Sequence, residues 1–308
     1  MSIRAEERMY DGIINVYKEK GFTSHDVVAK MRGILGHRKI GHTGTLDPDA
    51  TGVLPVALGK GTKLVDLLTD KEKTYEAVLH LGIDTDTQDM SGTVLEERPV
   101  NVTEEEVRKV LKSFVGEQLQ VPPMYSALKV NGKKLYELAR EGKVVERKAR
   151  PVKILDIRII EMNLPRVRME VSCSKGTYIR TLCHDIGEQL GCGGCMESLI
   201  RTRVSAFQIK DAKTLEEIGA LKQEGMLEEI LVPIDEMFPL YPKITVKDDW
   251  KAFAKNGNPL DEKMLKDADS QEEDRQVRLY EESGKFIAIY QWKEKEKKYH
   301  IVKMFFNE

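Results

Sequence analysis

The chain has 308 residues, a formal net charge of −2 and a hydrophobic share of 41%, values typical of a globular protein with a full core. No apolar run reaches the roughly 18 residues that a membrane helix requires, and the charged start from Met1 to Tyr10 lacks the pattern of a signal peptide. We therefore expect a cytoplasmic protein of about two domains that contacts no membrane.

The first half of the chain mixes helical and strand patterns. Ser24 is the predicted cap of a helix, because the apolar residues that follow it have helical spacing and Gly36 ends the pattern. Residues 74–81 alternate as a strand does, with Tyr75 on the more apolar side. Residues 103–106 form a capping box, which predicts a second helix that ends before Gly116.

The second half continues this mixture. Residues 152–161 and 166–173 read as two antiparallel strands, and apolar spacing after Gly176 predicts a helix with Arg180 in its first turn. Residues 199–207 are rich in β-forming residues, and 214–217 form another capping box. Because no regular βαβ alternation appears, the patterns favour an α+β fold over a doubly wound sheet.

A domain boundary is predicted where two prolines follow each other closely in residues 238–242. Beyond it, residues 276–280, 286–292 and 299–306 read as three short strands of a small β domain. We therefore divide the chain into a domain over 1–240 and a smaller domain over 241–308.

Basic residues are concentrated in one segment. Residues 124–153, termed the basic segment below, hold nine Lys and Arg against three Glu, although the whole chain is slightly acidic. Such a segment can neutralise several phosphates of a nucleic acid. A solvated charged loop is the ordinary alternative.

The four cysteines are too sparse for a disulfide framework, so we expect reduced thiols. Cys192 and Cys195 have the C-x-x-C spacing of half a zinc site, but no second pair completes four ligands. Residues 84–89 carry three aspartates but lack the glycine and glutamate of a calcium loop. We therefore predict no metal site, with a zinc site as the less favoured alternative.

The segment 41–52, Gly-His-Thr-Gly-Thr-Leu-Asp-Pro-Asp-Ala-Thr-Gly, places one carboxylate on a stiff loop. Its glycines permit backbone angles and close approaches that other residues cannot adopt, while Pro48 fixes its own φ and biases Asp47 away from helical angles. An ordinary Asx turn is the commoner fate of an isolated Asp-Pro pair. The length of this segment favours a reactive carboxylate at Asp47.

This segment resembles the catalytic signature of the pseudouridine synthases that modify the T arm of transfer RNA, of the bacterial tRNA pseudouridine synthase B type. Residues 15–24 look like the same family's K-P-x-G-x-T-S motif, with Glu19 where proline is usual, so the local turn is less rigid. The resemblance implies an α+β catalytic domain with a mixed, mainly antiparallel central sheet. It also implies a small C-terminal β-barrel-like RNA-binding domain of the PUA type.

The resemblance assigns roles to particular residues. It makes Asp47 the essential residue, places the ring of Tyr75 on the uracil and pairs Arg180 with Asp47. We expect Asp89 as a second candidate partner of Arg180. It gives His42 the role of entering the RNA and displacing the target nucleotide. Further residues expected to contact the substrate or the RNA are Lys18, Lys20, Lys63, Lys129, Tyr178 and Leu199.

Physical chemistry supports the pair of Asp47 and Arg180. A cation at the positive end of a helix is disfavoured unless a carboxylate compensates it, so Arg180 requires an acidic partner. Because a neighbouring guanidinium stabilises the charged form of a carboxyl group, we expect a lowered pKa for Asp47. The displaced nucleotide is a physical requirement, since a uridine inside a folded T arm cannot reach an enzyme carboxylate.

The reaction that the resemblance implies is isomerisation of uridine 55 of tRNA to pseudouridine, without metal or cofactor. The T arm of tRNA is the expected partner, with no obligatory protein partner and a monomeric enzyme. Whether Asp47 attacks the sugar, attacks the base or first removes a proton stays open. Alternatives are a non-catalytic tRNA-folding chaperone, a guide-RNA-dependent synthase, and a hydrolase that uses Asp47 and Asp49.

Overall fold

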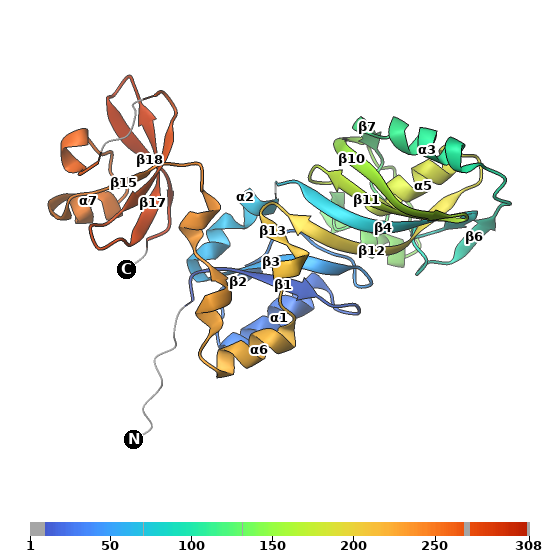
Figure 1. Cartoon of the computed structure of the whole chain (residues 1–308), viewed down its shortest axis with the longest axis horizontal. Helices are drawn as coiled ribbons and strands as arrows, with labels where there is room; N and C mark the ends of the chain where they lie inside the picture. The colour runs from blue at the N-terminus through green and yellow to red at the C-terminus, as the bar shows by residue number, and fades with distance from the viewer. Residues whose placement is uncertain (1–9, 70, 131, 268–271, 307–308) are drawn as a thin grey trace.

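The computed structural model describes residues 10–69, 71–130, 132–267 and 272–306, which form a large sheet with flanking helices and a separate small sheet (Figure 1). The described strands of the large sheet lie in the order β14 (Leu231–Val232), β1 (Gly12–Lys18), β3 (Thr51–Leu58), β12 (Gly194–Val204), β4 (Lys73–Leu81), β11 (Arg166–Cys173), β10 (Arg150–Asn163) and β7 (Gly116–Gln120), with β2 (Ile40–His42) beside β3 and β13 (Phe207–Gln208) beside β12.

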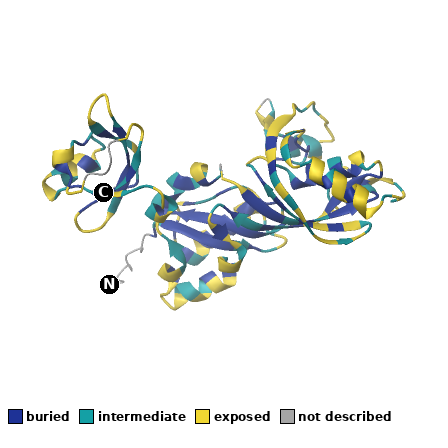
Figure 2. Ribbon diagram, turned by 45° about the horizontal axis from the view of Figure 1, so that its top comes forward, coloured by how far each residue is buried: buried dark blue, intermediate teal, exposed yellow. Residues whose placement is uncertain are grey.

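The large sheet is mixed and mainly antiparallel, as the resemblance implied. The pair of β3 and β12 is parallel, whereas the other strand pairs of this sheet run antiparallel. The predicted antiparallel pairing of 152–161 with 166–173 is confirmed in β10 and β11. Figure 2 shows that the strands are the buried layer of the molecule and that the helices expose their outer faces.

Two of the apolar clusters of the large sheet lie beneath its helices, and a third joins Ile13 and Val53 to Ile289 of the small sheet. Helices α1 (Ser24–Leu35) and α6 (Leu215–Gln223) pack on the half that contains β1 and β3. Helices α3 (Glu104–Ser113) and α5 (Ile179–Gln189) pack on the half that contains β4 and β11. Leu46 and Ala50, on the loop that joins β2 to β3, pack into this second core. The loop that carries Asp47 therefore bridges the two halves.

The predicted cap of helix α1 is wrong by one residue. Thr23, not Ser24, is the N-cap: its hydroxyl accepts a hydrogen bond from the Asp26 amide, and the Asp26 carboxylate accepts one from the Thr23 amide. This capping box leaves the Ser24 hydroxyl free to bond another segment. The helix ends at Gly36, which has a φ of 64°.

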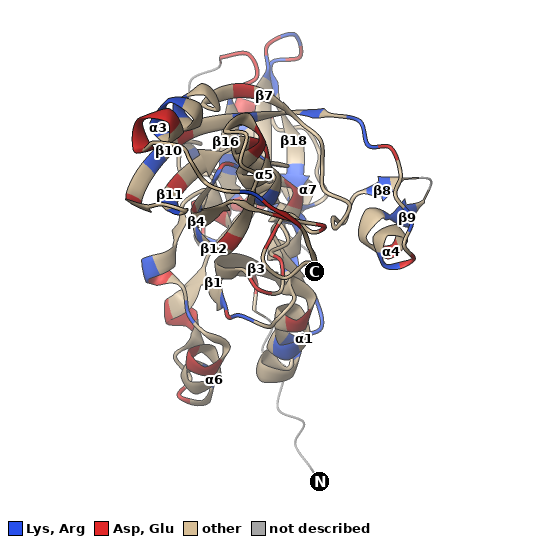
Figure 3. Cartoon of the chain, turned by 90° about the vertical axis from the view of Figure 1, so that its right-hand side faces the viewer, with Lys and Arg blue, Asp and Glu red and all other residues tan. Residues whose placement is uncertain are grey.

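Shorter elements connect these parts. They are η1 (Gly59–Leu64), α2 (Val65–Thr69), β5 (Ile83–Thr85), β6 (Val94–Glu97), β8 (Lys129–Val130), β9 (Lys133–Lys134), α4 (Leu135–Arg140), η2 (Ile209–Asp211), η3 (Leu227–Ile230) and η4 (Ile234–Met237). The β8–β9 hairpin and α4 lie within the basic segment, which extends away from the sheet (Figure 3).

The small sheet has its own core. Its strands lie in the order β15 (Lys243–Thr245), β16 (Gln276–Tyr280), β17 (Phe286–Lys293) and β18 (Lys298–Met304), and η5 (Asp248–Trp250), α7 (Lys251–Lys255) and η6 (Glu262–Met264) complete this unit. The three predicted strands are confirmed, with β15 added in parallel to β16. Over the described residues the strand order is that of an open sheet, not a closed barrel.

In the described ranges, no helix combines the length and the apolar character needed to cross a membrane.

Candidate active site

The loop that carries Asp47 is fixed at several points of its backbone. The Thr43 amide donates to the Pro55 carbonyl at 3.1 Å, and the Leu46 amide donates to the Ser24 hydroxyl at 2.9 Å. The Pro48 carbonyl accepts from the Gly21 amide at 2.9 Å. These contacts flank Asp47 on both sides, so the chain presents its carboxylate in a defined place.

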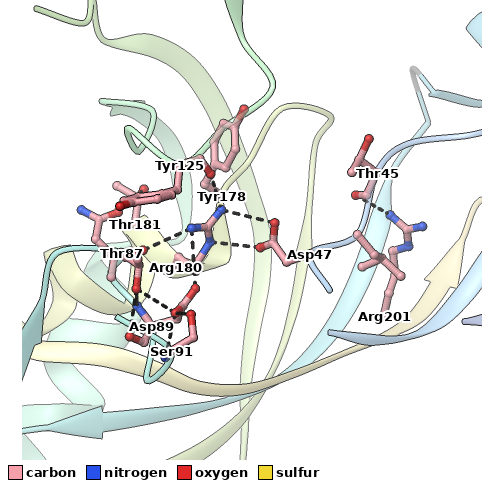
Figure 4. Close-up of polar contacts among 12 residues, drawn as sticks. Thr45, Asp47, Thr87, Asp89, Ser91, Tyr125, Tyr178, Arg180, Thr181 and Arg201 are labelled. Carbon is pink, nitrogen blue, oxygen red and sulfur yellow. Dashed lines mark hydrogen bonds and ion pairs between the residues drawn. The ribbon is translucent and has the colours of Figure 1, made fainter. Parts of the chain in front are cut away.

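Asp47 and Arg180 form a two-point ion pair (Figure 4). The Arg180 Nε lies 3.0 Å from Oδ2 of Asp47, and Nη2 donates to Oδ1 at 3.3 Å. The Arg180 side chain is only 6% exposed, whereas that of Asp47 is 42% exposed. The guanidinium therefore lies beneath a carboxylate that is only partly exposed, so a substrate reaches the carboxylate before it reaches the guanidinium.

Three further acceptors hold Arg180. Its Nη1 lies 3.6 Å from Oδ2 of Asp89 and donates to the Thr87 carbonyl at 3.2 Å, and its Nη2 donates to the Tyr125 carbonyl at 2.7 Å. Asp89 is itself held by the hydroxyl groups of Thr87 and Ser91. The structure thus brings together Asp47, Arg180 and Asp89, as the sequence predicted.

The predicted direction of the Asp47 pKa is wrong. Burial raises the pKa of Asp47 above the ordinary value for an aspartate, and this effect exceeds the opposite influence of Arg180; Asp89 adds to the rise. The sequence could identify the cation but not the desolvation, because the loop is folded against the core of the β4 half. The carboxyl group is consequently a stronger base than a free aspartate.

Tyr75 and Leu199 line the apolar side of the same region. They are 7% and 8% exposed, and both belong to the core cluster that includes Leu46 and Ala50. Burial raises the pKa of Tyr75 to about 12, so its hydroxyl is protonated at neutral pH. These residues can offer a flat and apolar surface to a base, whereas Asp47 supplies the charge.

His42 and Tyr178 lie at the edges of the region. His42 is the last residue of β2, and its ring meets that of His25 edge to face with 5.6 Å between the centroids. Burial lowers the pKa of His42, which favours the neutral ring. Its Nδ1 has no hydrogen-bond partner among the described residues. Tyr178, half-buried, is the residue before α5.

Two of the lysines predicted to bind RNA, Lys18 and Lys63, donate hydrogen bonds to backbone carbonyls of the protein. Lys18 is fully buried, and its Nζ donates to the carbonyls of Glu19, Phe22 and Pro48 at 2.6–3.1 Å. Burial lowers the pKa of Lys18 to about 8, so the ammonium persists at neutral pH and holds the loop from inside. Lys63 donates to the Met304 carbonyl and so contacts the small sheet rather than the Asp47 loop.

The other two lysines are exposed. The Lys20 side chain is 74% exposed and lies 4.0 Å from Asp49, and Lys129 is exposed on β8 in the basic segment. The Asp49 side chain is 64% exposed and points to Lys20. This arrangement gives Asp49 no contact with Arg180, so the hydrolase alternative gains no support.

Arg201 is a functional candidate that the sequence analysis missed. It is fully buried on β12, and its guanidinium donates to the carbonyls of Val53 at 2.7 Å, Gly44 at 3.2 Å and Thr45 at 3.5 Å. Arg201 and Lys18 thus hold the carbonyls on either side of Asp47. The signal in the sequence was the alternation of β12, which places residue 201 on the same inward side as Leu199.

The cysteines lie away from these contacts. Cys192 and Cys195 are buried, and burial raises the pKa of both thiols, to about 11 for Cys195. Across the part of the chain that the structure describes, no group of three or more His, Cys, Asp or Glu side chains could hold a metal ion.

Comparison with known proteins agrees with this geometry. Residues 32–179 match the family described as TruB family pseudouridylate synthase (N terminal domain), and residues 180–239 match the tRNA pseudouridylate synthase B C-terminal domain. The tRNA pseudouridine synthase B of Lachnoclostridium phytofermentans is 54% identical over 306 residues, which cover 96% of this chain and 99% of the relative. That of Alkaliphilus oremlandii is 46% identical over 284 residues, with 92% and 91% covered.

Solved structures show the same fold. A structure of an H/ACA RNP bound to a substrate RNA containing 2′-deoxyuridine matches with a TM-score of 0.71 and 26% identity, over 99% of this chain and 92% of the other. A Cbf5-Nop10-Gar1 complex matches with a TM-score of 0.71 and 30% identity, over 96% and 85%. The chain belongs to the TruB family of pseudouridylate synthases. It is an isomerase that forms pseudouridine in RNA, and its family acts on tRNA.

Proposed function

We propose that this chain converts uridine 55 in the T arm of tRNA to pseudouridine and that Asp47 is its catalytic carboxylate. The observation that supports this proposal is the ion pair in which buried Arg180 holds partly exposed Asp47 at two points. The choice of uridine 55, like that of the T arm, follows from the resemblance of residues 41–52 to the family's catalytic signature. The proposal extends to a stand-alone enzyme that binds tRNA through its own basic segment.

The chemistry requires a group that can act on a displaced nucleotide. In the isomerisation the bond between N1 of uracil and C1′ of ribose breaks, the base turns, and a bond from C5 to C1′ forms. The proton that C5 loses is balanced by the one that N1 gains. Asp47 is placed to approach such a nucleotide, and its raised pKa makes it a better proton acceptor than a free aspartate.

The surrounding residues take supporting roles in the proposal. Tyr75 and Leu199 hold the base through apolar contact, which is worth about 1 to 3 kcal/mol for a base on an aromatic ring. His42 enters the RNA in place of the displaced nucleotide, for which a neutral flat ring is suitable. The small C-terminal sheet over 241–308 contributes a second RNA-binding surface.

The test is to incubate the purified chain alone with an unmodified tRNA transcript and to map pseudouridine by position. We expect product at position 55 without guide RNA or partner protein. Asp47→Asn should lower turnover by roughly 10⁴-fold or more while tRNA affinity is retained, because the isostere keeps the shape but not the charge. Asp49→Asn, an exposed neighbour, should retain turnover.

Each alternative has its own outcome. Binding of tRNA without any product by the native chain would indicate a chaperone without catalysis. Product that appears only when a guide RNA and further proteins are added would indicate a guide-dependent synthase. Full turnover by Asp47→Asn would eliminate the mechanism.

A further inference from the structure

A glutamine side chain fixes the backbone that leads into Arg180. Gln120, the last residue of β7, is only 5% exposed. Its Oε1 accepts from the Tyr178 amide at 2.8 Å, and its Nε2 donates to the Tyr178 carbonyl at 3.0 Å. Tyr178 precedes α5, and no side chain caps this helix end. The side-chain amide of Gln120 therefore satisfies both backbone polar groups of Tyr178, as the backbone of a neighbouring β-strand would.

The same stretch of chain also holds the guanidinium. Five residues after Gln120, the Tyr125 carbonyl accepts from Nη2 of Arg180 at 2.7 Å. Pro122 and Pro123 stand between these two contacts, and both are buried. Because proline fixes φ, the stretch from 120 to 125 is stiff. It therefore binds the backbone of Tyr178, two residues before Arg180, and also the guanidinium of Arg180 itself.

This stretch is also where the basic segment joins the sheet. Arg150, at the far end of the basic segment, pairs with Gln120 in the ladder of β7 and β10. Nη1 of Arg147 donates to the Pro122 carbonyl at 3.1 Å. The Tyr136 amide of α4 donates to the Ser126 carbonyl at 3.1 Å. Both ends of the basic segment thus meet at residues 120–126, which we name the root (Figure 3).

We infer that Gln120 is a positioning residue for Arg180, through which the root of the basic segment sets the geometry of the Asp47–Arg180 pair. This inference rests on the proposed function of that pair. When RNA binds the basic segment, it pulls on residues 120–126. Because this stretch is stiff, a displacement there moves the start of α5 as well. A displacement of about 1 Å at a reacting group can cost on the order of 100-fold in rate, so the clamp has a kinetic effect without touching the substrate.

The test uses two substitutions at residue 120. Gln120→Met keeps the length of the side chain and removes both hydrogen bonds, whereas Gln120→Glu keeps the shape and the acceptor but cannot donate to the Tyr178 carbonyl. We expect kcat on tRNA to fall by about 10- to 100-fold in both variants, while KM and the Kd for tRNA stay within about twofold. If the substitution only destabilised the fold, less of the protein would be folded. The kcat of each folded molecule would then stay at the native level.

Gln118→Met is the matched control. Gln118 lies two residues earlier on β7, and its amide also donates to backbone carbonyls, those of Ser113 and Phe114, away from Arg180. It should keep kcat at the native level, with thermal unfolding followed for all variants. The inference is overturned if both Gln120 variants retain kcat, if KM rises in place of the loss of kcat, or if Gln118→Met loses as much. A native chain that forms no pseudouridine would instead overturn the proposed function.

Discussion

At the scale of single residues, Asp47 stands between effects of opposite sign. Burial raises its pKa, Arg180 opposes the rise, and Asp89 adds to it because two carboxylates near one another resist double ionisation. A raised pKa means that Asp47 keeps its proton to a higher pH than an aspartate in water. A step that requires the carboxylate therefore gains rate as pH rises through that pKa.

This balance predicts a shift of the pH profile in Asp89→Asn. Removal of the neighbouring negative charge lowers the pKa of Asp47, so the acid limb of kcat/KM should move to lower pH. The measurement is the initial rate of pseudouridine formation at low substrate across an acidic pH series. Asp49→Asn removes a more distant and exposed charge and should shift the limb less. An acid limb of Asp89→Asn that stays in place or moves upward would contradict the assignment of that limb to Asp47.

Arg201 allows a prediction about stability. In Arg201→Met the carbonyls of Gly44, Thr45 and Val53 lose their donor inside the protein. A buried acceptor without a partner costs about 1 to 3 kcal/mol, so we expect a loss on the order of 3 kcal/mol in the free energy of unfolding, with lower kcat. Urea unfolding measures the first quantity and single-turnover kinetics the second.

Arg203→Met is the comparison for that variant. Arg203 lies on the same strand, but it is only partly buried, and its Nε donates to the Thr74 hydroxyl at 3.1 Å. Its loss should cost about 1 kcal/mol or less. If the two variants lost equal free energy of unfolding and equal kcat, Arg201 would not stabilise the Asp47 loop more than Arg203 does.

At the scale of elements, α1 serves the site through its first turn. Thr23 closes the capping box, and this leaves the Ser24 hydroxyl to accept from the Leu46 amide at 2.9 Å. Leu46 is the residue before Asp47, so the start of α1 helps to determine where the Asp47 loop lies. The helix is therefore a support for the loop as well as a cover for the β1 half of the sheet.

Two adjacent substitutions can separate these roles. Thr23→Ala removes the cap and should cost about 1 kcal/mol of stability while kcat is kept. Ser24→Ala leaves the Leu46 amide without its partner, and we expect a similar cost of about 1 to 2 kcal/mol together with a clear loss of kcat. Thermal unfolding and steady-state kinetics at saturating tRNA check both. Equal effects on kcat would contradict the role of Ser24 in placing Asp47.

The elements also show what could be predicted from the sequence. Local patterns determined β10, β11, α3 and α5, because alternation and caps depend on neighbours in the chain. The resemblance of motifs paired Asp47 with Arg180 across 133 positions. The sequence analysis missed three features that depend on contacts between distant segments. These are the parallel pairing of β3 with β12, the hydrogen bonds of Gln120 with Tyr178 and the buried position of Lys18. The wrong direction of the Asp47 pKa has the same cause.

At the scale of the whole molecule, net charge conceals a separation of charge. The chain carries −2 overall, yet the basic segment holds nine cations against three acids and extends to one side of the sheet (Figure 3). Helix α3 lies on the other side, and its three glutamates are balanced by three cations, so it carries no net positive charge. A polyanion is therefore attracted to one flank, the flank from which the root leads to Arg180.

This separation predicts how tRNA affinity depends on salt. Lys129, Lys148 and Lys153 are exposed in the basic segment, and replacing all three with Gln should weaken tRNA binding without a change in fold. Each phosphate contact contributes about 0.7 to 0.9 to the slope of log K against log salt, so the slope should become shallower by about 2 if most of these lysines contact phosphate. The measurement is a binding series between low and physiological salt. The same replacement of Arg108, Lys109 and Lys112 on α3 removes equal charge from the opposite side and should leave the slope within about 0.5 of the native value. If the two triple variants lose affinity and slope equally, the attraction reflects total charge, and the basic segment is not the surface that binds tRNA.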